Sequence, residues 1–340
     1  MPSAIPRGQV VTLPVDSALL RGNRLGDPHR RELPVYLPPG YDEQPGRRYP
    51  VLFYLAGYSG IGAAQLNWRP WAETLPQRLD RLQAEGRMGP VILALPDCFT
   101  RLGGSQYIDS SVCGPYARHL VEELVPLVDA SFRTLTGREH RGVLGKSSGG
   151  FGAVVHAMLH AETWGAFACH SGDSAFELCF LSDLARSLDE IGRHGSVRAF
   201  LDAFFGKPKH SSAETHTVML LAMAACFDPL PEHPDGFVMP ADLQTGRISP
   251  ERWERWTRWD PARMICKYSE SLRKMRAIFI DCGSRDQYHL HFGARQMREE
   301  LRKLGIAHVY EEFPDNHSDV AYRLDSSLPL LYAALAAEVG

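Results

Sequence analysis

The stretch that decides the fold runs Arg141-Gly142-Val143-Leu144-Gly145-Lys146-Ser147-Ser148-Gly149-Gly150-Phe151-Gly152-Ala153-Val154-Val155. It begins with residues that can end a buried strand, passes through G-x-S-x-G, and continues into small and apolar residues of helical character. A serine in this setting sits on a sharp strand-to-helix turn with its hydroxyl raised above the sheet. We therefore predict a nucleophile at Ser147, a strained backbone there, and an oxyanion-binding N–H on Ser148, the first residue of the new helix.

Two other interpretations of this stretch compete with a nucleophile. A phosphate-binding loop, G-x-x-x-x-G-K-[ST], is excluded because position 140 is His140 and not glycine. A glycine-rich turn without chemistry remains open on the motif alone. An acid and a histidine that follow in the right order would favour the nucleophile.

Composition limits the class of protein. The chain has 340 residues, of which 44% are hydrophobic, and this suffices for a large core. A formal net charge of −3 argues against nucleic acid or an anionic membrane as the main partner. The N-terminal residues 1–7 lack the apolar run of a leader peptide, and no later run reaches membrane-spanning length. We expect a soluble, cytoplasmic protein.

The seven cysteines are odd in number, scattered, and form no C-x-x-C pair. This pattern indicates reduced thiols and favours neither a disulfide framework nor a zinc site. His289 and His291 form an H-x-H pair. Without a third ligand at a suitable spacing, we expect them to pack or to line a pocket, and we expect no metal.

Strand-like and helix-like segments alternate along the chain. Expected strands lie at 9–14, 31–37, 49–56, 90–96, 141–146, 165–170, 277–281 and 308–313, and expected helices at 71–82, 115–128, 147–155, 292–304 and 327–337. Several strands are continuous apolar runs, which is typical of sheets covered on both faces. The sequence predicts a single α/β domain over 1–340, with a mostly parallel sheet and helices on both faces. The polar loop 97–111 should be exposed.

About 100 residues separate the strand at 165–170 from the strand at 277–281, too many for a plain connection. They include an apolar patch at 218–227, a Pro/Gly-rich middle, and Trp253, Trp256 and Trp259. We interpret residues 174–274 as a helical, lid-like insertion over the carboxyl edge of the sheet. Trp253 and Trp256 are its candidate substrate-binding residues.

An acid and a histidine do follow Ser147 in order. Asp286 comes after the strand at 277–281, and His317 comes after the strand at 308–313. A serine nucleophile needs a base to take its proton, and the base needs an acid that fixes its tautomer. Asp281 and Asp315 compete for the acid's role. Asp281 should end its strand and Asp315 should make a turn.

Several further stretches carry a resemblance to a known family. They are Val35-Tyr36-Leu37-Pro38-Pro39-Gly40-Tyr41, Tyr49-Pro50-Val51-Leu52, Leu55-Ala56-Gly57-Tyr58, Glu122-Glu123-Leu124-Val125-Pro126, Gly145-Lys146-Ser147-Ser148-Gly149-Gly150, Gly283-Ser284-Arg285-Asp286 and His317. In these the chain resembles the putative-esterase family of α/β-hydrolases, which includes enterochelin esterases, esterase D-type enzymes and mycolyltransferases. The resemblance implies the α/β-hydrolase fold, a Ser147/Asp286/His317 triad, and a second oxyanion N–H on Tyr58.

The expected function is therefore a serine esterase that cleaves a carboxylic ester through an acyl-enzyme on Ser147, without a cofactor. An acyltransferase with the same triad and a non-catalytic hydrolase-fold binding protein are the alternatives. Loops after the strands supply further candidates for the substrate pocket: Ser105, Gln106, Tyr107 and Asp173. The expected partners are a small-molecule ester and, as one option, a second copy of the chain in a homodimer.

Overall fold

A computed structural model describes residues 5–337. The prediction that residues 1–7 carry no leader peptide rests partly on residues 1–4, which lie outside this range. The strands are β1 (Gln9–Asp16), β2 (Arg30–Leu37), β3 (Val51–Leu55), β4 (Ile92–Ala94), β5 (Asp109–Ser110), β6 (Gly114–Pro115), β7 (Arg141–Lys146), β8 (Ala166–His170), β9 (Ala277–Gly283) and β10 (Val309–Phe313). Eight of them form one sheet in the order β1-β2-β4-β3-β7-β8-β9-β10, and β5 and β6 form a separate hairpin.

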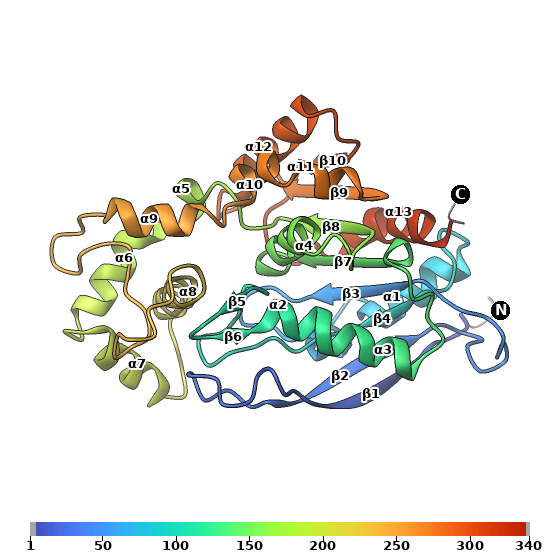
Figure 1. The fold of residues 1–340 in the computed structure, drawn as a ribbon, viewed down its shortest axis with the longest axis horizontal. Helices are drawn as coiled ribbons and strands as arrows, with labels where there is room; N and C mark the ends of the chain where they lie inside the picture. The colour runs from blue at the N-terminus through green and yellow to red at the C-terminus, as the bar shows by residue number, and fades with distance from the viewer. Residues whose placement is uncertain (1–4, 338–340) are drawn as a thin grey trace.

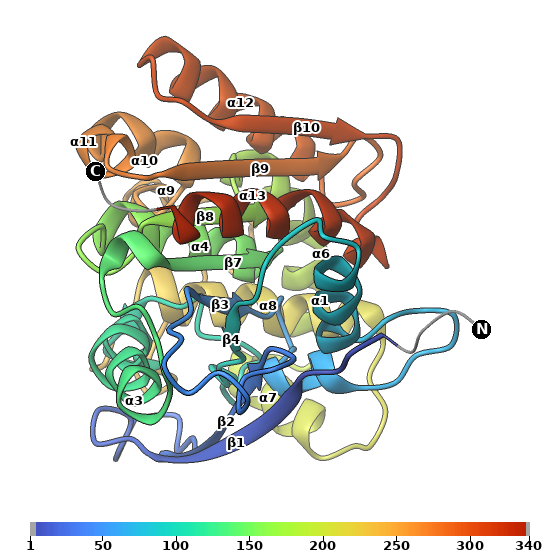
Figure 2. The ribbon, with the colours of Figure 1, turned by 90° about the vertical axis from the view of Figure 1, so that its right-hand side faces the viewer.

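The sheet is parallel except at β2, which pairs antiparallel with both β1 and β4. Figure 2 shows the sheet from β1 at one edge to β10 at the other. Because the strands of this sheet from β3 onward all run the same way, their carboxyl ends meet at one edge. The predicted α/β class, with a mostly parallel sheet, is confirmed.

Helices cover both faces of this sheet. The helices outside the insertion are α1 (Leu75–Ala84), α2 (Tyr116–Arg118), α3 (Val125–Ser131), α4 (Ser148–Leu159), α12 (Leu290–Lys303) and α13 (Leu324–Ala336). Shorter 3₁₀ turns lie at Gly62–Leu66, Arg138–His140 and Val320–Arg323, and a π-helical segment at His119–Leu124 joins α2 to α3.

Side chains alternate between the two faces along each central strand. On β3, Val51, Phe53 and Leu55 join the core beneath α2–α4 and α12, whereas Leu52 and Tyr54 join the core beneath α1 and α13. Figure 2 shows α1 and α13 crossing the near face of the sheet. Both faces are buried, which explains why the central strands are continuous apolar runs.

Helix boundaries differ from the expectation where capping decides them. The helix expected at 71–82 begins at Leu75, because the Thr74 side chain accepts from the backbone N–H of Gln77 and the Gln77 side chain reaches back to the backbone of Thr74. Trp71, expected inside that helix, is fully exposed at a positive φ of 57°.

Residues 174–274 are helical, with α5 (Phe176–Cys179), α6 (Leu181–Gly192), α7 (Val197–Phe205), α8 (Ser212–Phe227), α9 (Pro250–Thr257), α10 (Pro261–Lys267) and α11 (Ser269–Arg273). Figure 1 shows α6 to α9 beyond one end of the sheet, next to the β5–β6 hairpin. Helix α8 is buried along most of its length.

The loop 97–111 is not exposed as expected, because α8 covers part of it. Ser105 and Gln106 are each 1% exposed. The Ser110 hydroxyl donates to the carbonyl of Ala225 on α8, and the Gln106 amide contacts Met223 on the same helix. The prediction was wrong because the loop's polar groups find partners within the protein, some of them more than 100 residues away.

Candidate active site

The turn at Ser147 is held in a strained conformation. Its backbone angles are φ 57° and ψ −127°, a region that side chains with a Cβ rarely adopt. The Ser147 N–H donates to the carbonyl of His170 at 2.9 Å, and the Ser147 carbonyl accepts from the N–H of Phe151 at 2.9 Å. These two bonds tie the turn to β8 and to the first turn of α4.

Two glycines let β7 and α4 approach each other this closely. A Cβ on Gly149 would lie 1.9 Å from the carbonyl oxygen of Leu55, and a Cβ on Gly145 would lie 2.5 Å from the backbone of Gly149. Any larger residue at either position would push α4 away from the sheet. The G-x-S-x-G spacing is therefore a packing requirement of this turn.

His317 and Asp286 meet above the carboxyl ends of β9 and β10. His317 Nδ1 lies 2.7 Å from Asp286 Oδ2, and both side chains are buried. The backbone N–H of Tyr288 donates to Asp286 Oδ1, and the His317 N–H donates to the side chain of Gln287. The Tyr288 ring also packs edge-on against the imidazole, with centroids 4.9 Å apart. The imidazole is thus fixed in orientation.

The charge of Asp286 is stabilised in this position. Burial alone would raise the pKa of Asp286, but the hydrogen bond and charge of His317, together with backbone N–H donors, outweigh it and hold the pKa below its usual value. An ionised Asp286 favours the tautomer in which His317 Nδ1 carries the proton, because only that tautomer can donate to the carboxylate. Nε2 is then free to accept a proton.

The competing acids are engaged elsewhere. Asp281 Oδ1 lies 2.7 Å from His170 Nδ1, and Asp281 Oδ2 accepts from Arg323. Asp315 is half-buried and accepts from the N–H of Asn316 and from the hydroxyl of Tyr322. Neither carboxylate bonds to His317.

The loop after β3 lies against the turn at Ser147. A Cβ on Gly57 would be 3.5 Å from the Ser147 Cβ and 3.4 Å from the Lys146 carbonyl. The neighbouring Tyr58 is anchored by its hydroxyl, which donates to the Leu102 carbonyl at 2.8 Å. The backbone of Tyr58 is therefore held near Ser147, on a different segment from the Ser148 N–H at the start of α4.

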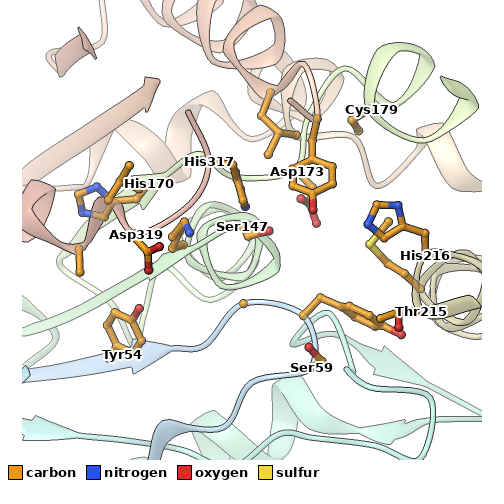
Figure 3. A pocket seen from close by; sticks show the side chains of 18 of the residues that line it. Tyr54, Ser59, Ser147, His170, Asp173, Cys179, Thr215, His216, His317 and Asp319 are labelled. Carbon is orange, nitrogen blue, oxygen red and sulfur yellow. The ribbon is translucent and has the colours of Figure 1, made fainter. Parts of the chain in front are cut away.

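A cavity of about 390 Å³ opens around Ser147 and His317. Figure 3 shows the two side chains in the middle of it, with Tyr54, His170 and Asp319 on one side and Thr215, His216 and Cys179 on the other. The second group comes from α5 and α8, so the insertion forms part of the wall. The cavity thus extends in two directions from Ser147.

Asp173 lines this cavity, as predicted from its place after β8. Its Oδ2 accepts from the hydroxyl of Ser148 and from the amide of Gln106, each at 3.2 Å. Burial raises the pKa of Asp173 to about 6. Its carboxyl group is therefore partly protonated near pH 6.

Ser105, Gln106 and Tyr107 lie outside the group of residues that line the cavity. They hold the wall in place instead. The Tyr107 hydroxyl donates to the Ala56 carbonyl at 2.6 Å, next to the Gly57–Tyr58 loop, and the Ser105 hydroxyl accepts from the N–H of Tyr107.

Trp253 and Trp256 also lie away from the cavity. Trp256 is 1% exposed and packs against Phe180, Phe227 and Trp253, with ring centroids 5.7–6.0 Å apart. These tryptophans attach α9 to the rest of the insertion. Of that cluster, Phe180 also reaches the cavity wall.

Sequence reasoning missed several residues on the wall, among them Thr215, His216 and Met219 of α8, and Lys146. From Val218 on, α8 is apolar on all sides, and the polar residues of its first turns carry no motif that marks a cavity wall. Lys146 directly precedes Ser147, and this position is a sequence signal that marks it as a candidate for the cavity wall.

Within residues 5–337, no helix is long and apolar enough to cross a bilayer, and no group of three or more His, Cys, Asp or Glu side chains has the arrangement of a metal site. His291 packs against the Phe292 ring at 4.2 Å between centroids, and His289 precedes α12 at a positive φ of 61°.

The sheet, its helices and the turn at Ser147 make up the α/β-hydrolase fold. A family model described as putative esterase matches residues 25–325, so the chain belongs to this family.

Partial matches to curated proteins agree with the family. An endo-1,4-beta-xylanase/feruloyl esterase of Xylanibacter ruminicola is 28% identical over 141 residues, 41% of this chain and 19% of that protein. An esterase of Mycobacterium tuberculosis is 30% identical over 148 residues, 43% of this chain and 30% of that protein. The match thus spans less than a third of the length of either relative.

Solved structures share the fold over nearly the whole chain. A ferulic acid esterase superposes with a TM-score of 0.59 at 20% identity, over 96% of this chain and 99% of that one. An S-formylglutathione hydrolase from Agrobacterium tumefaciens gives 0.59 at 17% identity, over 98% and 97%. At these identities the likeness concerns the fold.

Proposed function

We propose that this protein is a serine esterase that hydrolyses a carboxylic ester through an acyl-enzyme on Ser147. The single observation that carries the proposal is the buried 2.7 Å pair of His317 and Asp286, whose imidazole lines the same cavity as the strained Ser147. Membership of the putative-esterase family supports the reaction class.

In the first half-reaction, the Ser147 oxygen attacks the acyl carbon while His317 Nε2 takes its proton. Asp286 stabilises the imidazolium and does not itself take the proton. The N–H groups of Tyr58 and Ser148 donate to the oxyanion of the tetrahedral intermediate. His317 then returns the proton to the leaving alcohol, and the acyl group remains on Ser147.

In the second half-reaction, a water molecule attacks the acyl carbon. His317 accepts a proton from the water and returns it to the Ser147 oxygen as the acid leaves. No metal or redox cofactor takes part in these steps. The insertion at 174–274 acts as a fixed lid, because residues of α5 and α8 form one side of the cavity.

A panel of esters that includes 4-nitrophenyl acetate and methyl ferulate tests the proposal. We expect hydrolysis of at least one ester by the parent protein and loss of about 10⁴-fold or more in kcat in Ser147→Ala, with an unchanged circular dichroism spectrum. Turnover by Ser147→Ala within tenfold of the parent would refute the role of Ser147. Product analysis with added alcohols separates release of the free acid from acyl transfer.

A further inference from the structure

One side of the cavity gathers hydrogen-bond donors. Tyr54, Arg69 and Lys146 line it near Asp319: Arg69 pairs with Asp319, and the charges of both act on Lys146. We call these three residues the donor arm. Figure 3 shows Tyr54 and Asp319 on this side of Ser147, opposite Thr215 and His216. The donor arm starts directly beside the proposed nucleophile, because Lys146 is the residue before Ser147.

Lys146 is half-buried and carries a charge that the described chain leaves without a close partner. Among residues 5–337, no hydrogen bond or ion pair within 4.0 Å engages its ammonium group. Burial lowers the pKa of Lys146, while the more distant charges of Asp286 and Asp319 act in the opposite direction. A half-buried ammonium group without a hydrogen-bonded anion is costly, and a bound anion would remove that cost.

Tyr54 adds a neutral donor to the same cavity, where the charge of Arg69 acts on it. Its side chain is 7% exposed, and burial raises the pKa of Tyr54 to about 12, so its hydroxyl keeps its proton at neutral pH. Within the described part of the chain, this hydroxyl has no hydrogen-bond partner. Together, Tyr54 and Lys146 offer two unused donors to the cavity.

The remaining polar groups on this side of the cavity leave it with a net positive charge. Arg69 pairs only loosely with Asp319, at 3.5 Å, and their side chains are 64% and 88% exposed. An exposed pair of this kind contributes little stability and is readily exchanged. His170 cannot serve a ligand, because Asp281 and Ser327 occupy its two ring nitrogens at 2.7 and 2.8 Å.

The other acid on the cavity wall, Asp173, lies on the opposite side of Ser147 (Figure 3). The cavity is therefore asymmetric in charge. One side presents two cations, a hydroxyl and one exposed acid, whereas the other presents a buried carboxyl group, Thr215, His216 and apolar residues such as Phe180 and Met219.

We propose that Tyr54, Arg69 and Lys146 form a subsite for a carboxylate carried by the ester substrate. This inference rests on the proposed esterase function and specifies its substrate class as an ester with a free carboxylate. The carboxylate belongs either to the acid part, as in a half-ester of a dicarboxylic acid, or to the alcohol part, as in an ester of a hydroxy acid. Lysine and tyrosine donors suit a carboxylate in either position.

Two pairs of matched esters distinguish these sources. Mono-4-nitrophenyl adipate and 4-nitrophenyl hexanoate differ by a carboxylate on the acid part, and 4-acetoxybenzoate and 4-acetoxybenzamide differ by a carboxylate on the alcohol part. The readout is the ratio of kcat/KM for the charged ester to that for the neutral ester. In the ester pair whose carboxylate the subsite binds, Lys146→Met should lower this ratio about tenfold or more, and Tyr54→Phe should lower it by a smaller factor.

Two further variants sharpen the result. Asp319→Asn should raise the same ratio, because it removes the acid that competes for Arg69. Its backbone should be undisturbed, since asparagine tolerates the positive φ of 54° at this position. Lys209→Met removes an exposed lysine of the insertion and should leave the ratio unchanged.

The proposal is overturned if both ratios stay within twofold of the parent in Lys146→Met. Failure of the esterase function itself has a different signature, namely that neutral esters are not hydrolysed or that their hydrolysis survives Ser147→Ala. Binding measures the subsite independently of turnover. By calorimetry, adipate or 4-hydroxybenzoate should bind the Ser147→Ala protein and bind at least about tenfold more weakly when Lys146→Met is added. Absence of binding by both to Ser147→Ala would also refute the subsite.

Discussion

Ser147→Gly should stabilise the protein relative to Ser147→Ala, although both changes remove the proposed nucleophile. Both variants lack the hydroxyl, so their difference isolates the effect of a Cβ at φ 57° and ψ −127°. On an ordinary loop or helix, glycine would instead be the less stable choice, by about 0.5–1 kcal/mol. The sign of the difference therefore reports the strained turn.

Three contributions set the magnitude. A non-glycine residue in a sparsely populated region costs about 1–3 kcal/mol, and glycine relieves this cost. Glycine loses about 0.4–1 kcal/mol through the greater entropy of the unfolded chain. The missing methyl group is only half-buried, so its loss costs about 0.4 kcal/mol, half of the value for a fully buried one. The net expectation is about 1 kcal/mol in favour of glycine.

Urea denaturation followed by tryptophan fluorescence measures this difference directly in the free energy of unfolding. The thermal shift should be small, about 1–2 °C, because a chain of 340 residues has a large entropy of unfolding. If Ser147→Gly is less stable than Ser147→Ala by 0.5 kcal/mol or more, the turn at Ser147 is not strained and the elbow geometry is wrong.

Three more variants test the surroundings of the site. Asp286→Asn should lower kcat by about 10³- to 10⁴-fold because it favours the wrong tautomer of His317. Asp315→Asn should change kcat less than tenfold. If steady-state kinetics show the larger loss in Asp315→Asn, Asp286 is not the acid of the mechanism. Burial raises the pKa of Asp173 from its ordinary value of 3.8 to about 6. The folded protein therefore binds this proton more tightly than the unfolded chain does, and its stability falls as pH rises from about 4 to 6. The free energy of unfolding of Asp173→Asn minus that of the parent should therefore be larger at pH 7 than at pH 4, by on the order of 2–3 kcal/mol in urea titrations. An equal difference at both pH values would contradict the raised pKa. Trp256→Ala should destabilise the protein by about 3–5 kcal/mol, because the side chain is buried. It should lower activity on large and small esters together, since Trp256 lies outside the cavity. Selective loss of activity on bulky esters would show that Trp256 contacts substrate.

The parts of the site that follow strands could be predicted from sequence. Ser147 follows β7 directly, and Asp286 and His317 come three and four residues after the ends of β9 and β10. Parallel strands bring their carboxyl ends to one edge of the sheet. Local patterns are enough for this inference. The same reasoning placed Asp173 on the cavity wall.

The wall supplied by α8 could not be predicted in this way. From Val218 on, the helix is apolar on all sides, and the polar residues of its first turns show no pattern that tells which of them face the cavity. The burial of the loop at 97–111 could not be predicted for a related reason. The Ser110 hydroxyl donates to the Ala225 carbonyl, a partner 115 residues away. Contacts between residues so far apart in the sequence depend on how the insertion packs, and the composition of the loop does not reveal that packing.

Intact-mass spectrometry with a fluorophosphonate probe tests the central claim most directly. We expect the parent protein to gain the mass of one phosphonyl group, located by peptide mapping on Ser147, and His317→Ala to react at least about 100-fold more slowly because it lacks the base. Ser147→Ala should remain unlabelled. Labelling at any other residue, or equal labelling of Ser147→Ala, would contradict the assignment of Ser147 as the nucleophile.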